Sequence, residues 1–380
     1  MLALFRYNMK LLLTAKQRGS TNALAPIARE LQTRGHQLTL YATGNDNEAL
    51  GFNGLPYQQI TPAEEDYARL VRGYDAVILG LSGKDTPDGH FLRAATTARI
   101  PTLAVLDQNG NYEGRLGSNP VYLPTVLAVM DETCLKTAGK ELTPEMLEEA
   151  AKRSKIVGWP AFDHFAVLRQ GFSAQARADL LKKLGLNPDQ QVYFHATQNI
   201  HPNSDYSKRF PGTHDEKLLS YSYELNATDM IFEVASDLNL KLVVKPHPGE
   251  EYVQNKTREM AEQHGFTYLQ AKACNTVDLI LSAASITATR SSCLTEATLL
   301  DKNTGAILPD SVGRNWGATC QPVALGAIPA MYNWNGGAEI LSMLTSSDQE
   351  IQAKLAQDRK KFSVDGKASQ RLAELVESLR

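Results

Sequence analysis

The stretch Lys241-Leu242-Val243-Val244-Lys245-Pro246-His247-Pro248 joins a short apolar run to a polar turn. A second stretch repeats this arrangement, because Ser285-Ile286-Thr287-Ala288-Thr289 leads into Ser291-Ser292 and then into an apolar helical pattern. Short runs rich in β-branched residues are typical of strands, and prolines directly after them are typical of turns. Open parallel sheets bind ligands at the carboxyl ends of their strands. The sequence therefore predicts two polar clusters at this edge of a parallel sheet.

The polar residues after these two strands suit a diphosphate. Lys245, His247 and Arg290 supply hydrogen-bond donors, and Ser291-Ser292 adds two hydroxyls at the start of a helix. The free N–H groups of a helix start also attract phosphate. Glu296 lies one turn into the same helix, where its carboxylate could accept hydrogen bonds from a ribose. Together these residues predict a binding site for a sugar nucleotide.

Each of these residues also has a structural alternative. Lys245 and His247 could simply end a strand, with the neighbouring prolines stiffening the turn. Ser291-Ser292 could be a helix N-cap, and Glu296 could interact only with the helix dipole. Arg290 could be a solvated surface charge. The pairing of the two clusters favours ligand binding, and the cap remains an open alternative.

Length and composition limit the class of protein. The chain has 380 residues, of which 43% are hydrophobic, so it can form about two domains. Its formal net charge of −3 gives no general attraction to nucleic acid or to an anionic membrane. The first apolar run, Leu11-Leu12-Leu13, is too short to span a bilayer and has no signal-peptide cleavage pattern. We therefore expect a cytoplasmic protein without a transmembrane segment, with residues 1–8 as an extension outside the fold.

Cysteine and histidine usage gives no support for a metal site. Cys134, Cys274, Cys293 and Cys320 are scattered and form no CxxC pair, so reduced thiols are expected. The eight histidines are dispersed, and no HExxH motif is present. We expect no bound metal and no cofactor, and the diphosphate charge would be balanced by N–H groups and basic side chains.

Short apolar runs alternate with helical patterns along the chain, which favours parallel sheets with helices on both faces. The predicted strands are Lys10–Ala15, Gln37–Ala42, Ala76–Leu81, Thr102–Asp107, Val126–Met130, Lys155–Val157, Gln191–Ala196 and Lys241–Val244, with further strands near Phe266, Val277, Ile286 and Gly305. The main predicted helices are Asn22–Thr33, Ala63–Val71, Glu216–Leu238 and Glu251–His264. The predicted fold class is α/β, with two Rossmann-like doubly wound domains facing a cleft.

The boundary between the two domains is expected between Pro160 and Pro188, where Ser173 can cap a helix that Gly185 ends. Residues 1–170 then form an N-terminal domain, which would present the second substrate, the acceptor, to the sugar nucleotide. Residues 171–365 form a C-terminal nucleotide-sugar-binding domain. The last helix, residues 366–380, is expected to cross back to the first domain.

Three further positions follow predicted strands. His195 and Thr197 would reach the ligand from the second domain, although a buried and satisfied histidine is an equally good interpretation. Asp107 ends a strand of the first domain, where a general base would be placed, but it could equally cap a loop. The segment 197–214 is too long for a routine connection and is typical of either a lid or a surface loop.

The first strand–loop–helix resembles that of the GT-B glycosyltransferases and their relatives, the UDP-GlcNAc 2-epimerases and the CDP-glycerol and capsule-type transferases. The resemblance rests on Lys10–Ala15, the loop Gly19-Ser20-Thr21, Pro26 and the helix end Arg34-Gly35-His36. The histidine of the lipid II-type GlcNAc transferases is replaced by Ala23. The acidic residue of the epimerases is replaced by Ser20, although Arg18, Ala25 and Pro26 match them, and their later HRREN-like signature is missing.

Later motifs extend the resemblance. Gly158-Trp159-Pro160-Ala161-Phe162-Asp163 is similar to the GxPxFD-like turn that closes the first domain of capsule-type proteins. Lys245-Pro246-His247-Pro248 resembles the HP motif of bacterial sialyl- and CDP-polyol transferases, and Ser291-Ser292 resembles their serine motif. Glu296-Ala297 is similar to the acidic position that contacts ribose in many GT-B enzymes. The resemblance implies a UDP, CMP, CDP or GDP donor and metal-independent turnover.

The sequence thus predicts a metal-independent GT-B glycosyltransferase that moves a sugar from a nucleotide-sugar donor to a hydroxyl of a glycan or glycoconjugate acceptor. Surface polysaccharide synthesis is the expected context, in the cytoplasm or at the inner face of the membrane. The catalytic candidates are Asp107 and His247. The substrate-binding candidates are Gly19, Ser20, His195, Thr197, Lys245, Arg290, Ser291, Ser292 and Glu296. A sugar-nucleotide 2-epimerase or hydrolase, and a noncatalytic nucleotide-sugar-binding protein, are the alternatives.

Overall fold

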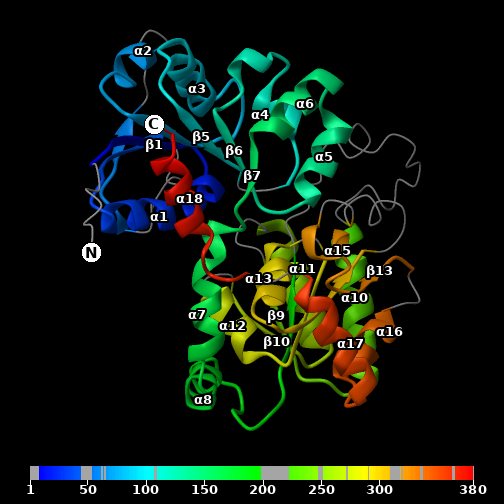
Figure 1. The fold of residues 1–380 in the computed structure, drawn as a ribbon. Helices are drawn as coiled ribbons and strands as arrows, with labels where there is room; N and C mark the ends of the chain where they lie inside the picture. The colour runs from blue at the N-terminus through cyan, green and yellow to red at the C-terminus, as the bar shows by residue number, and fades with distance from the viewer. Residues whose placement is uncertain are drawn as a thin grey trace. The chain divides into compact units, whose positions relative to one another are not determined.

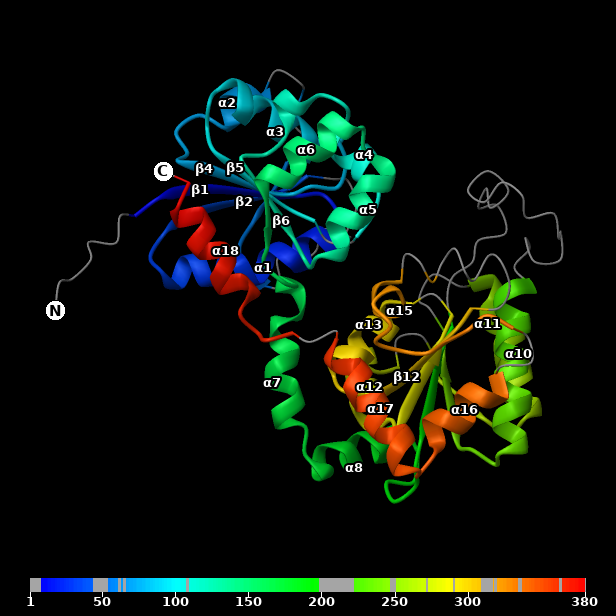
Figure 2. The ribbon, with the colours of Figure 1, turned by 45° about the vertical axis from the view of Figure 1, so that its right-hand side comes forward.

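The computed structural model describes residues 8–43, 54–60, 63, 66–106, 109–197, 222–246, 251–270, 273–289, 291–308, 317, 320–333, 337–361 and 364–379. The chain divides into two compact units. Unit 1 contains Met1–His164 and Val364–Arg380, and unit 2 contains Phe165–Ser363. Each unit is built on one parallel sheet (Figures 1 and 2). No helix in the described part of the chain is both long enough and apolar enough to cross a membrane.

The sheet of unit 1 has the strand order β3-β2-β1-β4-β5-β6-β7, and its paired strands are parallel. The strands are β1 Lys10–Ala15, β2 Gln37–Thr43, β3 Gln58–Ile60, β4 Ala76–Gly80, β5 Thr102–Val105, β6 Val126–Val129 and β7 Ser154–Ile156. The helices are α1 Arg18–Thr33, α2 Asp66–Leu70, α3 Pro87–Thr97, α4 Tyr112–Leu116, α5 Thr133–Glu141, α6 Pro144–Arg153 and α18 Ala368–Glu377, with short 3₁₀ turns η3 Pro120–Tyr122 and η4 Pro160–Phe162. The order of strands reverses between β1 and β4. This reversal is the point where doubly wound sheets bind ligands.

Strand β1 explains why this sequence forms a covered parallel sheet. Leu11 and Leu13 pack into the core beneath α1 and α18, whereas Leu12 packs into the core on the opposite face with Phe91 of α3. All three leucines have no exposed surface. A strand buried on both faces reads as a continuous apolar run, as parallel sheets require.

The sheet of unit 2 has the strand order β10-β9-β8-β11-β12-β13 and is also parallel. Its strands are β8 Tyr193–Ala196, β9 Leu242–Lys245, β10 Thr267–Tyr268, β11 Ser285–Ala288, β12 Asn303–Ile307 and β13 Ala330–Met331. Its helices are α8 Ala174–Lys183, α10 Ser222–Asp237, α11 Glu251–Gln263, α12 Thr276–Ser282, α13 Ser292–Leu299, α15 Gln321–Ala324, α16 Gly337–Thr345 and α17 Gln349–Lys360, and α7 Asp163–Gly171 leads into the unit. Helices α10 and α16 pack together on one side of the sheet, and α12 and α13 pack together on the other (Figures 1 and 2). The switch point of this sheet lies between β8 and β11.

One predicted strand is wrong, because Val277 lies in helix α12. Asn275 caps this helix by accepting a hydrogen bond from the Val277 N–H at 2.9 Å. Leu279, Ile280 and Leu281 of the run after Asn275 are buried, and a short buried run does not distinguish a strand from a helix by its periodicity. The Asx cap is the local feature that decides for the helix.

Helix α18 is part of unit 1, although it comes from the far end of the sequence. Leu372 and Val376 are fully buried in the same core as α1. The start of this helix packs closely against Gly158. This glycine has φ +90°, and a Cβ added to it would lie 3.3 Å from the Cβ of Ala368. The Asp163 carboxylate caps α18 by accepting from the N–H groups of Ala368 at 3.0 Å and Ser369 at 2.7 Å. The Gly158–Asp163 motif therefore packs against the start of the C-terminal helix α18 and caps it.

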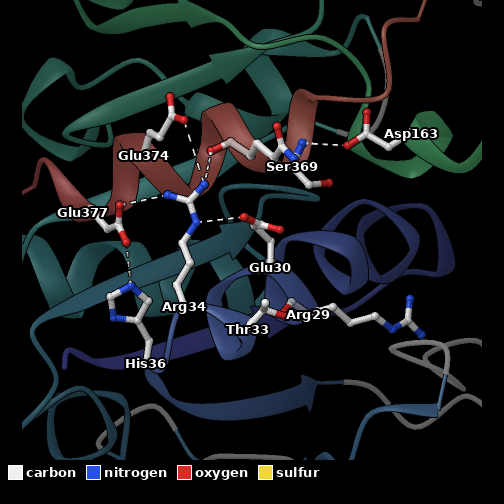
Figure 3. A network of polar contacts seen from close by, with 10 residues as sticks. Arg29, Glu30, Thr33, Arg34, His36, Asp163, Ser369, Glu374 and Glu377 are labelled. Carbon is white, nitrogen blue, oxygen red and sulfur yellow. Dashed lines mark hydrogen bonds and ion pairs between the residues drawn. The ribbon is translucent and has the colours of Figure 1, made fainter. Parts of the chain in front are cut away.

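A polar network holds the other end of α18 (Figure 3). Arg34 binds Glu30 through Nε at 2.8 Å and Glu377 through Nη1 at 2.9 Å. The His36 Nδ1 accepts from the backbone N–H of Met9 at 3.2 Å, so its Nε2 carries the proton and donates to Glu377 at 3.1 Å. Burial raises the pKa of Glu377, but the His36 hydrogen bond and the Arg34 charge outweigh it, and the net pKa is lowered.

We expect Glu377→Gln to destabilise unit 1 by about 1 kcal/mol near pH 7, since the carboxylate is only partly buried. A lowered pKa means that this contribution is present above the pKa of the unfolded chain and is lost as the pH falls. In urea unfolding, the difference in the free energy of unfolding between the wild type and Glu377→Gln should therefore shrink as the pH is lowered. Glu374→Gln is the control, because Glu374 is 67% exposed and lies 3.9 Å from Arg34. If the difference in free energy of unfolding between the wild type and Glu377→Gln does not change with pH, this role of Glu377 is contradicted.

Candidate functional site

Three strand ends meet at the carboxyl edge of the sheet in unit 2. Strand β8 lies between β9 and β11, with Ala196 in register with both Lys245 and Ala288. The N–H of Thr197 donates to the carbonyl of Lys245 at 3.2 Å. The residues that follow β8, β9 and β11 therefore share one edge, at the switch point of the sheet.

Lys245 is the last residue of β9, and its side chain is almost fully buried, with 6% exposure. Its Nζ donates to the hydroxyl of Thr276, the first residue of α12, at 3.0 Å. Desolvation raises the pKa of the Cys293 thiol to about 12, and the nearby Lys245 charge opposes this rise. The same charge also opposes the raised pKa of Cys274. The ammonium group of Lys245 thus lies at the start of α12, and its charge also acts on Cys293 in the first turn of α13.

The serine pair forms the start of α13. Ser291 is the N-cap, and its hydroxyl accepts from the Cys293 N–H at 3.2 Å. Ser292 is exposed, and Glu296 is half-buried, close enough to Cys293 that its charge raises the pKa of that thiol. The first N–H groups of a helix have no partner within the helix and form a positive end. The structure therefore brings Lys245, Ser291, Ser292 and Glu296 to one edge, and the N-cap alternative for Ser291 is observed as well.

His195 lies in the interior rather than at the edge. It has no exposed surface, and its ring nitrogens contact the hydroxyls of Thr287 at 2.9 Å and Thr228 at 3.4 Å. Desolvation lowers the pKa of His195 to about 4, so the ring is neutral at neutral pH. This geometry favours the buried, satisfied histidine over a phosphate contact. Thr197 is 2% exposed, and its contact with a ligand stays a prediction.

Several predicted site residues lie outside the described part of the chain. These are Asp107, His247 and Arg290, together with residues 198–214 of the segment 197–214. Their roles stay predictions. Within the described ranges, no group of three or more histidine, cysteine, aspartate or glutamate side chains is placed to hold a metal ion.

In unit 1, the expected glycine-rich loop Gly19-Ser20-Thr21 is the first turn of helix α1, which begins at Arg18. The hydroxyl of Ser20 donates to the Gln17 carbonyl at 2.9 Å and accepts from the Gln17 N–H at 3.2 Å, which stabilises this early start. A Cβ at Gly80 would lie 2.5 Å from the Cβ of Ser20, so only glycine allows this approach of α1 to the end of β4. Ser20 is 1% exposed, whereas Gly19 is exposed. Of the two predicted substrate contacts, Gly19 is the accessible one.

A buried carboxylate that the sequence analysis did not single out lies near the ends of β1, β2 and β4 in unit 1. Asp88, the second residue of α3, has no exposed surface. Its carboxylate accepts from the hydroxyls of Ser82 at 2.7 Å, Thr14 at 3.3 Å and Thr43 at 3.5 Å. Desolvation raises the pKa of Asp88 to about 6, although Ser82 and Thr14 act in the opposite direction. Asp88 thus ties the loop after β4 to β1 and β2.

Solved structures of similar fold cover nearly the whole chain. A UDP-GlcNAc 2-epimerase from Neisseria meningitidis bound to UDP-GlcNAc matches with a TM-score of 0.68 and 14% identity, over 97% of this chain and 100% of that chain. A glycosyltransferase from Rickettsia africae matches with a TM-score of 0.66 and 9% identity, over 98% of each chain. MurG from Acinetobacter baumannii matches with a TM-score of 0.57 and 14% identity, over 98% of this chain and 100% of that chain.

No protein-family model and no curated protein sequence matches this chain. At these identities the structural likeness defines the fold. The fold is α/β of the GT-B type, with two Rossmann-like parallel sheets, and the predicted fold class is confirmed.

Proposed function

We propose that this protein transfers a sugar from a nucleotide-sugar donor to a hydroxyl acceptor. The observation that carries the proposal is the position of the Lys245 ammonium, which Thr276 holds at the carboxyl edge of the sheet in unit 2, the edge at which Ser291 caps α13. A cation next to free helix N–H groups suits the diphosphate of a donor.

In this proposal, residues 171–365 hold the donor. Lys245 and the N–H groups at the start of α13 contact the diphosphate, and Glu296 contacts the ribose. When the glycosidic bond to the diphosphate breaks, negative charge develops on the phosphate oxygens. Fixed donors at this point stabilise the transition state more than the ground state. His247 and Arg290 are assigned to the same diphosphate.

Residues 1–170 present the acceptor, with Asp107 as the base that takes the proton of the attacking hydroxyl. Residues 366–380 belong to the same acceptor side, and Gly19 offers a backbone contact at the start of α1. The chemistry requires no metal, because side chains and helix N–H groups balance the charge. The context is surface polysaccharide or glycoconjugate synthesis.

A second candidate is a sugar-nucleotide 2-epimerase or hydrolase. It is favoured by the fold match to a UDP-GlcNAc 2-epimerase whose structure contains UDP-GlcNAc. The same donor site would serve this chemistry without an acceptor. Incubation with UDP-GlcNAc alone distinguishes the two, because an epimerase or hydrolase forms a new sugar product and a transferase requires an added acceptor hydroxyl.

The proposed donor site predicts stabilisation by a nucleotide that carries the phosphates of the donor. In a thermal-shift panel of UDP, CDP, GDP, dTDP and CMP, at least one nucleotide should raise the melting temperature, because ligand that binds only the folded state stabilises it. The matching nucleoside should have a much smaller effect, since it lacks the phosphates. If none of these nucleotides raises the melting temperature, both the transferase and the epimerase proposals are ruled out.

A further inference from the structure

The Lys245 ammonium is held by a hydroxyl on a neighbouring helix. Its Nζ lies 3.0 Å from Oγ1 of Thr276, which is 31 residues away in sequence. We propose that Thr276 is a positioning residue that aims the Lys245 ammonium at the phosphates of the ligand. This inference rests on the proposed function, and it adds a residue that the ligand itself need not touch.

The type of partner matters for this role. A hydroxyl oxygen accepts one hydrogen bond from the ammonium without neutralising its charge, whereas a carboxylate partner would cancel much of the attraction for phosphate. Among the residues that the structure describes, no carboxylate forms an ion pair with Lys245, and Thr276 is its one side-chain hydrogen-bond partner. An ammonium group has three N–H donors. Two are then left for phosphate oxygens.

Both ends of this contact are fixed by the fold. The backbone of Lys245 is held in the sheet, where its carbonyl accepts from Thr197. Thr276 begins a helix that Asn275 caps and that Leu279 and Ile280 anchor without any exposed surface. A free lysine side chain would lose considerable rotamer freedom on binding a phosphate. The Thr276 contact removes part of that loss before the ligand arrives.

The test uses the full chain and the nucleoside diphosphate among UDP, CDP, GDP and dTDP that the wild type binds most tightly. Isothermal titration gives the affinity for this diphosphate and for its nucleoside. Thr276→Val removes the hydroxyl at nearly constant volume, and we expect it to weaken diphosphate binding about 10-fold while leaving nucleoside binding unchanged. Thr276→Ser restores the hydroxyl and should recover most of the affinity. Thr276→Ala serves in place of the valine variant if that protein does not fold.

Thr298→Val is the matched control. It makes the same exchange in the same unit, at a buried threonine whose hydroxyl bonds the Leu294 carbonyl within α13 at 2.6 Å. We expect wild-type affinity for both ligands. A purely structural role for Thr276 would weaken the diphosphate and the nucleoside equally, and that result, or wild-type diphosphate affinity in the valine variant, would overturn the inference. Failure of the wild type to bind any diphosphate would instead sink the proposed function and this inference with it.

Discussion

Lys245→Met is expected to lower the affinity for the preferred nucleoside diphosphate about 10- to 100-fold. Methionine keeps the buried apolar stem of the side chain and removes only the charged donor. A hydrogen bond to a charged group contributes about 1.5–3 kcal/mol, which corresponds to this loss. Nucleoside affinity should not change, because the ammonium is assigned to the phosphates. Isothermal titration with the diphosphate and the nucleoside measures both effects.

Lys241→Met provides the control for this variant. Lys241 is exposed and lies just before the opposite end of the same strand, so it shares the charge change but not the site. We expect it to bind nucleotides as the wild type does. If Lys245→Met also binds the diphosphate with wild-type affinity, then Lys245 only terminates β9.

Asp88→Asn is expected to make the chain more stable than the wild type above about pH 6. The pKa of Asp88 in the folded protein is about 6, above its ordinary value of 3.8. Between these two values the folded state keeps a proton that the unfolded chain has released, so wild-type stability falls as the pH rises. The asparagine variant cannot ionise and escapes this loss. Its advantage should grow by on the order of 2–3 kcal/mol between about pH 4 and pH 7 and then stay constant.

Urea unfolding at a series of pH values measures this difference. Asp85→Asn is the control, because Asp85 lies in the same loop but is solvent-exposed and paired with Lys84. The Lys84 hydrogen bond lowers the pKa of Asp85, so any small effect there has the opposite dependence on pH. An advantage of the Asp88 variant that is the same at all pH values would mean that Asp88 does not titrate in this range.

The parts of the fold that could be predicted from sequence are those in which one strand or helix carries its own signal. Strand β1 is found at the expected residues Lys10–Ala15, because an apolar run buried on both faces is unambiguous. The start of α1 was predicted four residues too late. Gly19 and Ser20 are typical of a loop, and only the contacts of Ser20 with Gln17 show that the helix has already begun.

In the site, contacts between residues distant in the sequence could not be predicted either. Lys245 and Ser291 could be named because each directly follows a strand. Thr276 could not, because its contact with Lys245 depends on where the fold places the start of α12 relative to the end of β9. Asp88 reads as an ordinary residue in the first turn of a helix, and its hydrogen bonds come from Thr14, Thr43 and Ser82, which three different segments supply.

The central claim is that the carboxyl edge of the sheet in unit 2 binds the diphosphate of a nucleotide sugar. A crystal structure of the protein with the nucleoside diphosphate that stabilises it most would test this claim directly. We expect the phosphate oxygens to lie within hydrogen-bond distance of Lys245 Nζ and of the first N–H groups of α13, with the ribose next to Glu296. A diphosphate bound elsewhere, with Lys245 still bonded only to Thr276, would contradict the account.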